Sequence, residues 1–416
     1  MKHIMLICVL LLSLVLTTTA QQDDPIIDYG FTYQNATGNR YIEGQGNILD
    51  SGLDIATYNG DSVNWIVPIA VDDTFVFHNE NGTLDFLVDS LTDDSDVSGY
   101  FPAEKLLSGL SALWNPFLPL SDVSLLSHPV PIDNDVVYIA DNGDLVLLRD
   151  EVEIHRLPIN AMLDARPVVS DEGLIAIYTN PTDRYPHGVF GDELEGGALD
   201  ILEVAGDILR RVAFVQLDED DVFEGLYPFW ADIDQDGEQD VVTTVSGRGL
   251  GAGLRVYRAD GGILAQGERI GLSNRWRHQI AYAPFTVDGA YELVEIITPH
   301  IGGIVNFVRY NPETNMLETT ASVRGYTSHV YGSRNVDMAI AGDYNDDGQP
   351  ELVVTTQDGS RLVGLQRGLD NIITEVWSIN LSAQVITNFA GFRLSDERIG
   401  LVIGFDDDTI YRWRPR

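Results

Sequence analysis

The chain of 416 residues carries 64 acidic against 25 basic side chains, a formal net charge of −39 at pH 7. A surface this acidic repels phosphates, so the composition argues against nucleic acids and anionic membranes as partners. Hydrophobic residues make up 44% of the chain, which is enough for a packed core and excludes a disordered protein. An exported protein in a cation-rich medium and a halophilic protein share this composition, and the sequence leaves both open.

The first twenty residues are expected to be a signal peptide. Lys2 gives a basic start, and residues 4–16 form an apolar run shorter than the ~20 residues that span a bilayer. Residues 18–20 (Thr-Thr-Ala) offer a small-residue cleavage site. An uncleaved anchor is the alternative.

The mature chain, residues 21–416, is expected to be one domain without a membrane span, secreted or periplasmic. It holds no disulfide, because the only cysteine, Cys8, lies in the signal segment. Helical periodicity is confined to residues 103–114, which predict one short amphipathic helix. Elsewhere short β runs are separated by turn dipeptides such as Asn81-Gly82, a pattern typical of an all-β fold.

The predicted strands sort into about seven units of roughly 40–60 residues, a period that indicates a repeat fold. Strands are expected at residues 65–69 and 75–78 in the first unit, at 136–140 and 145–148 in the second, and at 167–170, 174–179, 198–204 and 208–216 in the third. The fifth unit covers residues 280–323, and the last covers 385–413. Six or eight units stay open, and a pair of β-sandwiches is the alternative fold.

The fourth and sixth units each contain a nine-residue stretch with the pattern D-x-[DN]-x-D-G-x-x-[DE]. Oxygen-bearing side chains at positions one, three, five and nine suit Ca²⁺, which takes about 6–8 oxygen ligands. The glycine at position six permits a tight loop, and position seven would offer its backbone carbonyl. The predicted calcium ligands are Asp232, Asp234, Asp236, Glu238 and Asp240 in the first loop, and Asp343, Asn345, Asp347, Gln349 and Glu351 in the second.

Two other kinds of structure could account for these loops, an EF-hand and a plain acidic turn. An EF-hand needs a glutamate at position twelve, where Thr243 and Val354 stand, and both loops run into β-branched strands rather than helices. A plain acidic turn is the remaining alternative. Recurrence in one register before similar strands favours cation sites. The matching residues 283–294 of the fifth unit are one residue short and lack the first acid, so no metal is expected there.

The motif, followed by a strand and a second hairpin, resembles the FG-GAP/VCBS repeat, which also occurs in the integrin alpha-subunit propeller. The match covers residues 229–257 and 339–365 and is degenerate elsewhere. The resemblance implies a β-propeller with Ca²⁺ between the first two strands of a blade, and no specific activity. We therefore expect an all-β propeller of about seven four-stranded blades. Residues 21–53 would close the ring by adding a strand to the last blade.

In regular blades the calcium loops share one face, and the other connections meet on the opposite face. That face is expected to carry Arg166, Arg184, His187, Arg248, Arg277, His278, His300, His329, Arg334 and Arg361. Guanidinium groups bind carboxylates, phosphates and sulfates in a bidentate way. This predicts a site for an anionic extracellular ligand such as an acidic polysaccharide. The alternative is that each arginine pairs with a neighbouring carboxylate.

The predicted function is non-enzymatic binding of an extracellular glycan or protein. The alternative is a carbohydrate-active enzyme, a lyase or a hydrolase, that works at the same face with a histidine as base. The sequence contains no HExxH or HxH pair, no Gly-x-Ser-x-Gly elbow and no Walker A loop. No catalytic residue is therefore assigned.

Overall fold

The protein is described by a computed structural model that covers residues 27–31, 37–57, 63–69, 74–79, 84–87, 122–124, 126–127, 129–133, 135–150, 152–271, 274–394 and 396–416. Within these ranges the chain is all β, with 31 strands and no helix. The expected signal peptide and the expected helix at residues 103–114 lie outside the described residues. None of the described residues forms a helix that could cross a lipid bilayer.

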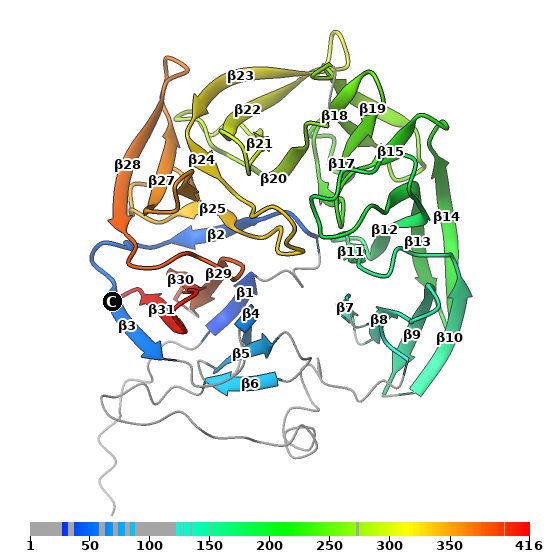
Figure 1. Cartoon of the computed structure of the whole chain (residues 1–416), viewed down its shortest axis with the longest axis horizontal. Helices are drawn as coiled ribbons and strands as arrows, with labels where there is room; N and C mark the ends of the chain where they lie inside the picture. Colours follow the sequence, from blue (N-terminus) through cyan, green and yellow to red (C-terminus); the bar gives the residue numbers. More distant parts are fainter. Residues whose placement is uncertain are drawn as a thin grey trace, which may run out of the picture.

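The strands form sheets that follow one another around a common centre, and neighbouring strands are antiparallel except in two pairs (Figure 1). The first sheet holds β4 (Val63–Ile69), β5 (Thr74–Asn79) and β6 (Leu84–Leu87), and the second holds β7 (Val130–Ile132), β8 (Asp135–Ile139), β9 (Asp144–Arg149) and β10 (Val152–Pro158). The third unit consists of β11 (Val168–Val169), β12 (Leu174–Thr182), β13 (Glu195–Ala205) and β14 (Ile208–Gln216). Its last strand has the bounds that the sequence predicts.

The fourth and fifth units continue the sheet of the third unit. The fourth holds β15 (Asp221–Phe223), β16 (Phe229–Ala231), β17 (Asp240–Gly247), β18 (Gly251–Tyr257) and β19 (Ile263–Gly267), and the fifth holds β20 (Arg277–Ala283), β21 (Glu292–Ile297), β22 (Ile304–Asn311) and β23 (Met316–Arg324). Single pairs join the units: β13 with β15, and β19 with β23 in parallel. All eight residues of β17 are buried, which fits its β-branched sequence between two packed faces.

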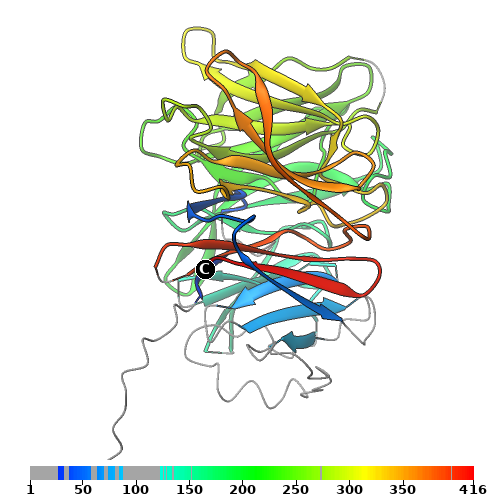
Figure 2. The same cartoon turned by 90° about the vertical axis from the view of Figure 1, so that its left-hand side faces the viewer.

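The two C-terminal sheets both include strands from the N-terminal part of the chain. One holds β24 (Tyr326–Thr327), β25 (Ala339–Asp343), β26 (Glu351–Thr356), β27 (Arg361–Arg367) and β28 (Ile373–Asn380), with β2 (Tyr41–Gln45) parallel to β25. The other holds β29 (Ala390–Leu394), β30 (Ile399–Gly404) and β31 (Thr409–Arg414), flanked by β1 (Ile27–Phe31) and β3 (Gly52–Thr57). Seen from the side, this last sheet (red) lies between the β25–β28 sheet and the β4–β6 sheet (Figure 2).

The segment of residues 37–51 crosses the centre of the molecule and touches several units in turn. Trp230 N–H donates to the Thr37 carbonyl at 2.8 Å, and Ala341 N–H donates to the Arg40 carbonyl at 2.8 Å. Farther along, Gly46 N–H donates to the carbonyl of Asp343, also at 2.8 Å. The segment that contains β2 thus connects β16 of the fourth unit with β25 of the sixth (Figure 1).

An ion network is buried at this centre. Asp337 is 1% exposed and forms ion pairs with Arg166 and, at 3.1 Å, with Arg40. The Tyr227 hydroxyl donates to the same carboxylate at 2.5 Å. Although burial acts to raise it, the two guanidinium groups hold the pKa of Asp337 below its usual range. One buried carboxylate at the centre is therefore shared by two guanidinium groups and a tyrosine hydroxyl.

Candidate functional site

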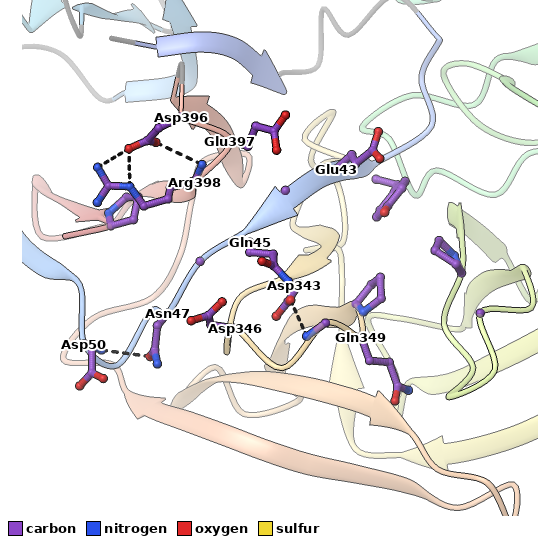
Figure 3. Close-up of a pocket in the computed structure, with 18 of the residues that line it drawn as sticks. Glu43, Gln45, Asn47, Asp50, Asp343, Asp346, Gln349, Asp396, Glu397 and Arg398 are labelled. Carbon is purple, nitrogen blue, oxygen red and sulfur yellow. Dashed lines mark hydrogen bonds and ion pairs between the residues drawn. The ribbon is translucent and has the colours of Figure 1, made fainter. Parts of the chain in front are cut away.

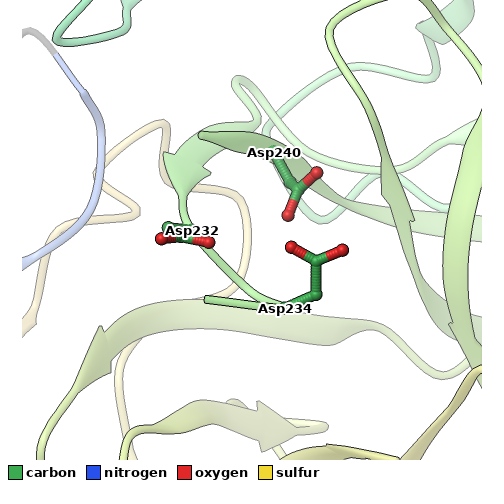
Figure 4. Close-up of side chains that lie close together, drawn as sticks. All are labelled: Asp232, Asp234 and Asp240. Atoms are coloured by element: carbon green, nitrogen blue, oxygen red, sulfur yellow. The ribbon is translucent and has the colours of Figure 1, made fainter. Parts of the chain in front are cut away.

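The first acidic loop joins β16 to β17 and gathers three carboxylates around one point. One oxygen from each of Asp232, Asp234 and Asp240 lies within 4.8 Å of the others (Figure 4). The loop's own amides hold two of them: Asp236 and Gly237 donate to Asp232 at 3.0 Å each, and Ile233 N–H donates to Asp240 at 3.1 Å. The backbone therefore places Asp232 and Asp240, while Asp234 pairs with Arg258 at 3.2 Å.

The second acidic loop joins β25 to β26 and repeats this arrangement. Oxygens of Asp343, Asp347 and Glu351 lie within 4.8 Å of one another. Asp347 and Gly348 donate to Asp343 at 3.2 and 2.8 Å, and Tyr344 N–H donates to Glu351 at 2.8 Å. In both loops the first acid accepts from positions five and six, and the ninth accepts from position two.

The backbone of the two loops also turns in the same way. Position four is left-handed in both, with φ of 59° at Gln235 and 62° at Asp346. Position six is left-handed as well, with φ of 96° at Gly237 and 86° at Gly348, a region that favours glycine. Two turns that share hydrogen bonds and dihedral angles at every constrained position form one structural motif, used twice.

The electrostatics of both loops suit a cation. Burial, followed by the charges of Asp234 and Asp236, raises the pKa of Asp240 to about 7. Burial, followed by Asp343 and Asp347, raises the pKa of Glu351 to about 8. Clustered, partly buried carboxylates repel one another, and a bound cation removes that cost. The donors are all oxygens, which fits a hard cation such as Ca²⁺.

The other predicted ligands take supporting positions. Asp236 accepts from Glu238 N–H at 2.9 Å, and Asn345 accepts from Asp347 N–H at 3.0 Å. The Gln349 side chain donates to the carbonyls of Phe285 and Arg367, at 2.7 and 2.6 Å. The Gln349 side chain is therefore bonded to the backbone of neighbouring strands, and the role of its backbone carbonyl as an ion ligand stays a prediction.

The ten residues predicted on the opposite face lie mostly in connections at the strand ends away from the acidic loops. Most of the arginines among them are paired with carboxylates or hydrogen-bonded to the backbone. Carboxylate partners hold four of them: Arg166 pairs with Asp337, Arg277 with Glu295, Arg334 with Asp164 and Asp192, and Arg361 with Glu375. Arg184 donates to the Asp221 carbonyl at 2.7 Å, and Arg248 is exposed.

The four predicted histidines come together with Trp276. The His300 ring lies 6.2 Å, centroid to centroid, from His187 and also from His329. Trp276 stacks on His278 at 4.4 Å and meets His329 edge-on at 5.0 Å. Burial lowers the pKa of His329 to about 4, against a hydrogen bond with the Ser333 backbone that acts to raise it, and the neighbouring histidines add to the lowering. The His329 ring is therefore neutral near pH 7. A small cavity of about 210 Å³ is lined by His300 and His329.

Sequence analysis did not single out Glu224, which lies beside this cluster. Its fully buried carboxylate bonds to Nδ1 of His187 and to the Ser246 hydroxyl. A carboxylate on one ring nitrogen fixes the tautomer and leaves the other nitrogen free to accept a proton. Because Ser246 contacts the carboxylate and not the imidazole, the three residues do not form a hydrolase triad.

Two larger cavities lie beside the two acidic loops, and Tyr41 lines both of them. One, of about 690 Å³, is lined by Asp343, Asp346 and Gln349 of the second loop and by Asp396 and Arg398 (Figure 3). The other, of about 770 Å³, borders the first loop and is lined by four tyrosines: Tyr41, Tyr282, Tyr291 and Tyr310. In the sequence, the signal for this tyrosine-lined cavity is the pair of tyrosines, Tyr282 and Tyr291, at the shortened loop of the fifth unit.

No protein-family model matches the chain, and no curated protein matches its sequence. Among solved structures it resembles the quinohemoprotein alcohol dehydrogenase ADHIIG from Pseudomonas putida HK5, with 11% identity, a TM-score of 0.54, and coverage of 92% of this chain and 80% of that one. BamB from Moraxella catarrhalis has 12% identity and a TM-score of 0.40, with 93% of this chain and 97% of BamB covered. The Cps50 (Swd1) propeller domain of Myceliophteria thermophila has 10% identity and a TM-score of 0.47, with 87% of this chain and 98% of that domain covered. These structural neighbours are β-propellers, and at such identities the likeness concerns the fold alone.

Proposed function

We propose that the protein is a secreted, calcium-binding propeller of the FG-GAP/VCBS type that binds a glycan or a protein outside the cell. The observation that carries the proposal is the repeated acidic loop, with the same hydrogen bonds, the same left-handed positions and three clustered carboxylates in each copy. Calcium would brace the fourth and sixth units by neutralising these carboxylates.

We further assign seven blades in one domain. The blades would be β4–β6, β7–β10, β11–β14, β15–β19, β20–β23, β24–β28 and β29–β31, with the pairs β13–β15 and β19–β23 as contacts between blades. The last blade takes β3 as its outer strand, because Gly52–Thr57 pairs with Thr409–Arg414 over six residues. This pairing supports closure of the ring by the N-terminal part of the chain.

The calcium proposal is tested by calorimetric titration of the mature chain and by melting curves in Ca²⁺ and in chelator. We expect two sites, and Asp234→Ala should lower the melting temperature in Ca²⁺ while leaving it nearly unchanged in chelator. Asp288→Ala is the matched control, since Asp288 is an exposed acid of the shortened loop in the fifth unit. Equal losses in both buffers for Asp234→Ala would mean that the loop is only a turn.

The ligand proposed for the opposite face is an anionic glycan held by the more accessible guanidinium groups, those of Arg248, Arg334 and Arg361. A carbohydrate-active enzyme is the second candidate, and the His187–Glu224 pair favours it because a buried carboxylate positions an imidazole for proton abstraction. Incubation with an acidic polysaccharide distinguishes them: retention without new chain ends supports binding, and new chain ends that His187→Ala abolishes support the enzyme.

A further inference from the structure

The cavity of about 770 Å³ lies between the first acidic loop and the shortened loop of the fifth unit, residues 284–291. Asp232 and Asp234 form its wall on one side, and Asp288 and Tyr291 form the wall on the other. The volume falls within the range of about 300–1,000 Å³ that is usual for small-molecule sites. The missing residue of the fifth loop therefore coincides with an opening large enough for a ligand.

The tyrosines of this cavity are held in place by the surrounding structure. Tyr282 is 8% exposed, and its backbone exchanges two hydrogen bonds with the Asn39 side chain, at 2.8 and 3.0 Å. Its hydroxyl donates to the Ile233 carbonyl, inside the first acidic loop, at 3.4 Å. Tyr291 lies against it with the ring centroids 5.1 Å apart and is 39% exposed. One fixed ring thus supports a second ring that is open to solvent.

The lining stays acidic when the first loop holds calcium. Asp232, Asp234 and Asp288 line the cavity, and Asp240 completes the carboxylate cluster of the loop. A bound Ca²⁺ ion offsets two of these four negative charges, and Arg309 in the lining is already paired with Glu292 at 2.9 Å. The remaining negative charge repels an acidic ligand, and a cationic ligand would compete with the metal for the carboxylates. The loaded pocket therefore suits a ligand without net charge.

We propose that this tyrosine pocket binds an uncharged saccharide, an inference that rests on the proposed calcium binding of the adjacent loop. Tyrosine offers a large, rigid apolar face at low entropic cost, on which the C–H face of a sugar ring can stack. In the lining, Gln235 offers its amide to the sugar hydroxyls, and Arg309, which gives one N–H to Glu292, has further N–H groups to donate. An aromatic platform with a rim of polar groups is the arrangement that such a ligand requires.

The test is calorimetric titration of the mature chain in Ca²⁺ with cellohexaose, xylohexaose and mannohexaose, and with hexagalacturonate as the acidic probe. We expect at least one neutral probe to bind, with affinity reduced about tenfold or more by Tyr291→Ala and kept by Tyr291→Phe. Tyr331→Ala is the matched control, because Tyr331 is 59% exposed and lies in the connection between β24 and β25, next to His300. That variant should bind the neutral probe as the unaltered protein does.

A parallel calcium titration separates failure of this inference from failure of the calcium proposal. If both loops take up Ca²⁺ but no neutral probe binds, or if Tyr291→Ala and Tyr331→Ala bind alike, the saccharide site is overturned and the calcium sites stand. If the first loop takes up no Ca²⁺, the calcium proposal fails and the charge argument for a neutral ligand fails with it.

Discussion

Glu351 illustrates why a buried acid in these loops has a use beyond the turn itself. Its side chain is fully buried, and one of its two oxygens accepts from Tyr344 N–H at 2.8 Å. A carboxylate in this position is costly without a compensating charge, and burial together with Asp343 and Asp347 raises its pKa to about 8. A cation would turn the same group into a stabilising one.

Glu351→Gln is therefore expected to act in opposite directions with and without calcium. In saturating Ca²⁺ the variant should lose the stabilisation of one site, about 2.7 kcal/mol when the ion is present at 100 times its dissociation constant. In chelator at pH 9, above the raised pKa of Glu351, it should melt at or above the temperature of the unaltered protein, since a neutral amide of similar size replaces a buried charge. Calorimetric melting in both buffers measures this difference.

The exposed Glu313 provides the control, and Glu313→Gln should leave both melting temperatures unchanged within about 0.5 kcal/mol. Should Glu351→Gln destabilise the protein equally in both buffers, Glu351 would be an ordinary structural hydrogen-bond acceptor and not a ligand.

At this scale, the part of the candidate site that could be predicted is the part that is local in sequence. The oxygen-bearing side chains of an acidic loop all lie within nine residues, so the amino-acid pattern alone indicates that they cluster. The tyrosine pocket combines Tyr41 with Tyr282 and Tyr310, which meet only after the chain has folded. The partner of Arg166, Asp337, is equally remote, and spacing alone cannot indicate such pairs.

Among the elements, the strands with clear turn signals were predictable and the crossing segment was not. The third unit's strands match β11–β14 because Gly173 and Gly206, both with positive φ, mark two of its turns. Residues 21–53 were expected to add a strand to the last blade, and β1 and β3 pair with β29 and β31. The sequence does not predict that β2 lies beside β25, because the β2 residues, Y-I-E-G-Q, lack the alternating pattern of a strand.

The docking of this crossing segment depends on a close backbone approach at Gly46. A Cβ atom there would lie 2.3 Å from the Ile399 carbonyl oxygen, closer than such atoms can approach. Gly46→Ala should therefore displace the segment from β30 and destabilise the protein by about 1–3 kcal/mol. Urea unfolding followed by tryptophan fluorescence would measure the loss.

Gly52→Ala, in the same part of the chain, is the matched control, because its Cβ would have no neighbour nearer than 3.7 Å. That variant should be unchanged or slightly more stable, since alanine restricts the unfolded chain. If the two variants unfold at the same urea concentration, the segment is not held against β30 in solution.

For the whole molecule, the excess of acidic over basic groups is the dominant electrostatic feature. With 64 acidic and 25 basic residues, most carboxylates have no basic partner to compensate them. Several of the basic residues are also used in buried pairs, such as Arg277 with Glu295 and Arg367 with Glu292. The remaining surface carries a net repulsion that opposes the compact state.

Monovalent salt should therefore raise the melting temperature even when chelator keeps the acidic loops free of calcium. The Debye length falls from about 10 Å at 0.1 M to about 3 Å at 1 M ionic strength, which screens surface repulsion and leaves buried pairs nearly unaffected. We expect a rise of several degrees across this range in both potassium chloride and tetramethylammonium chloride, because the two salts share screening but differ in cation chemistry. A constant or falling melting temperature would mean that exposed ion pairs, such as Arg149 with Asp207 at 2.6 Å, outweigh the acidic excess.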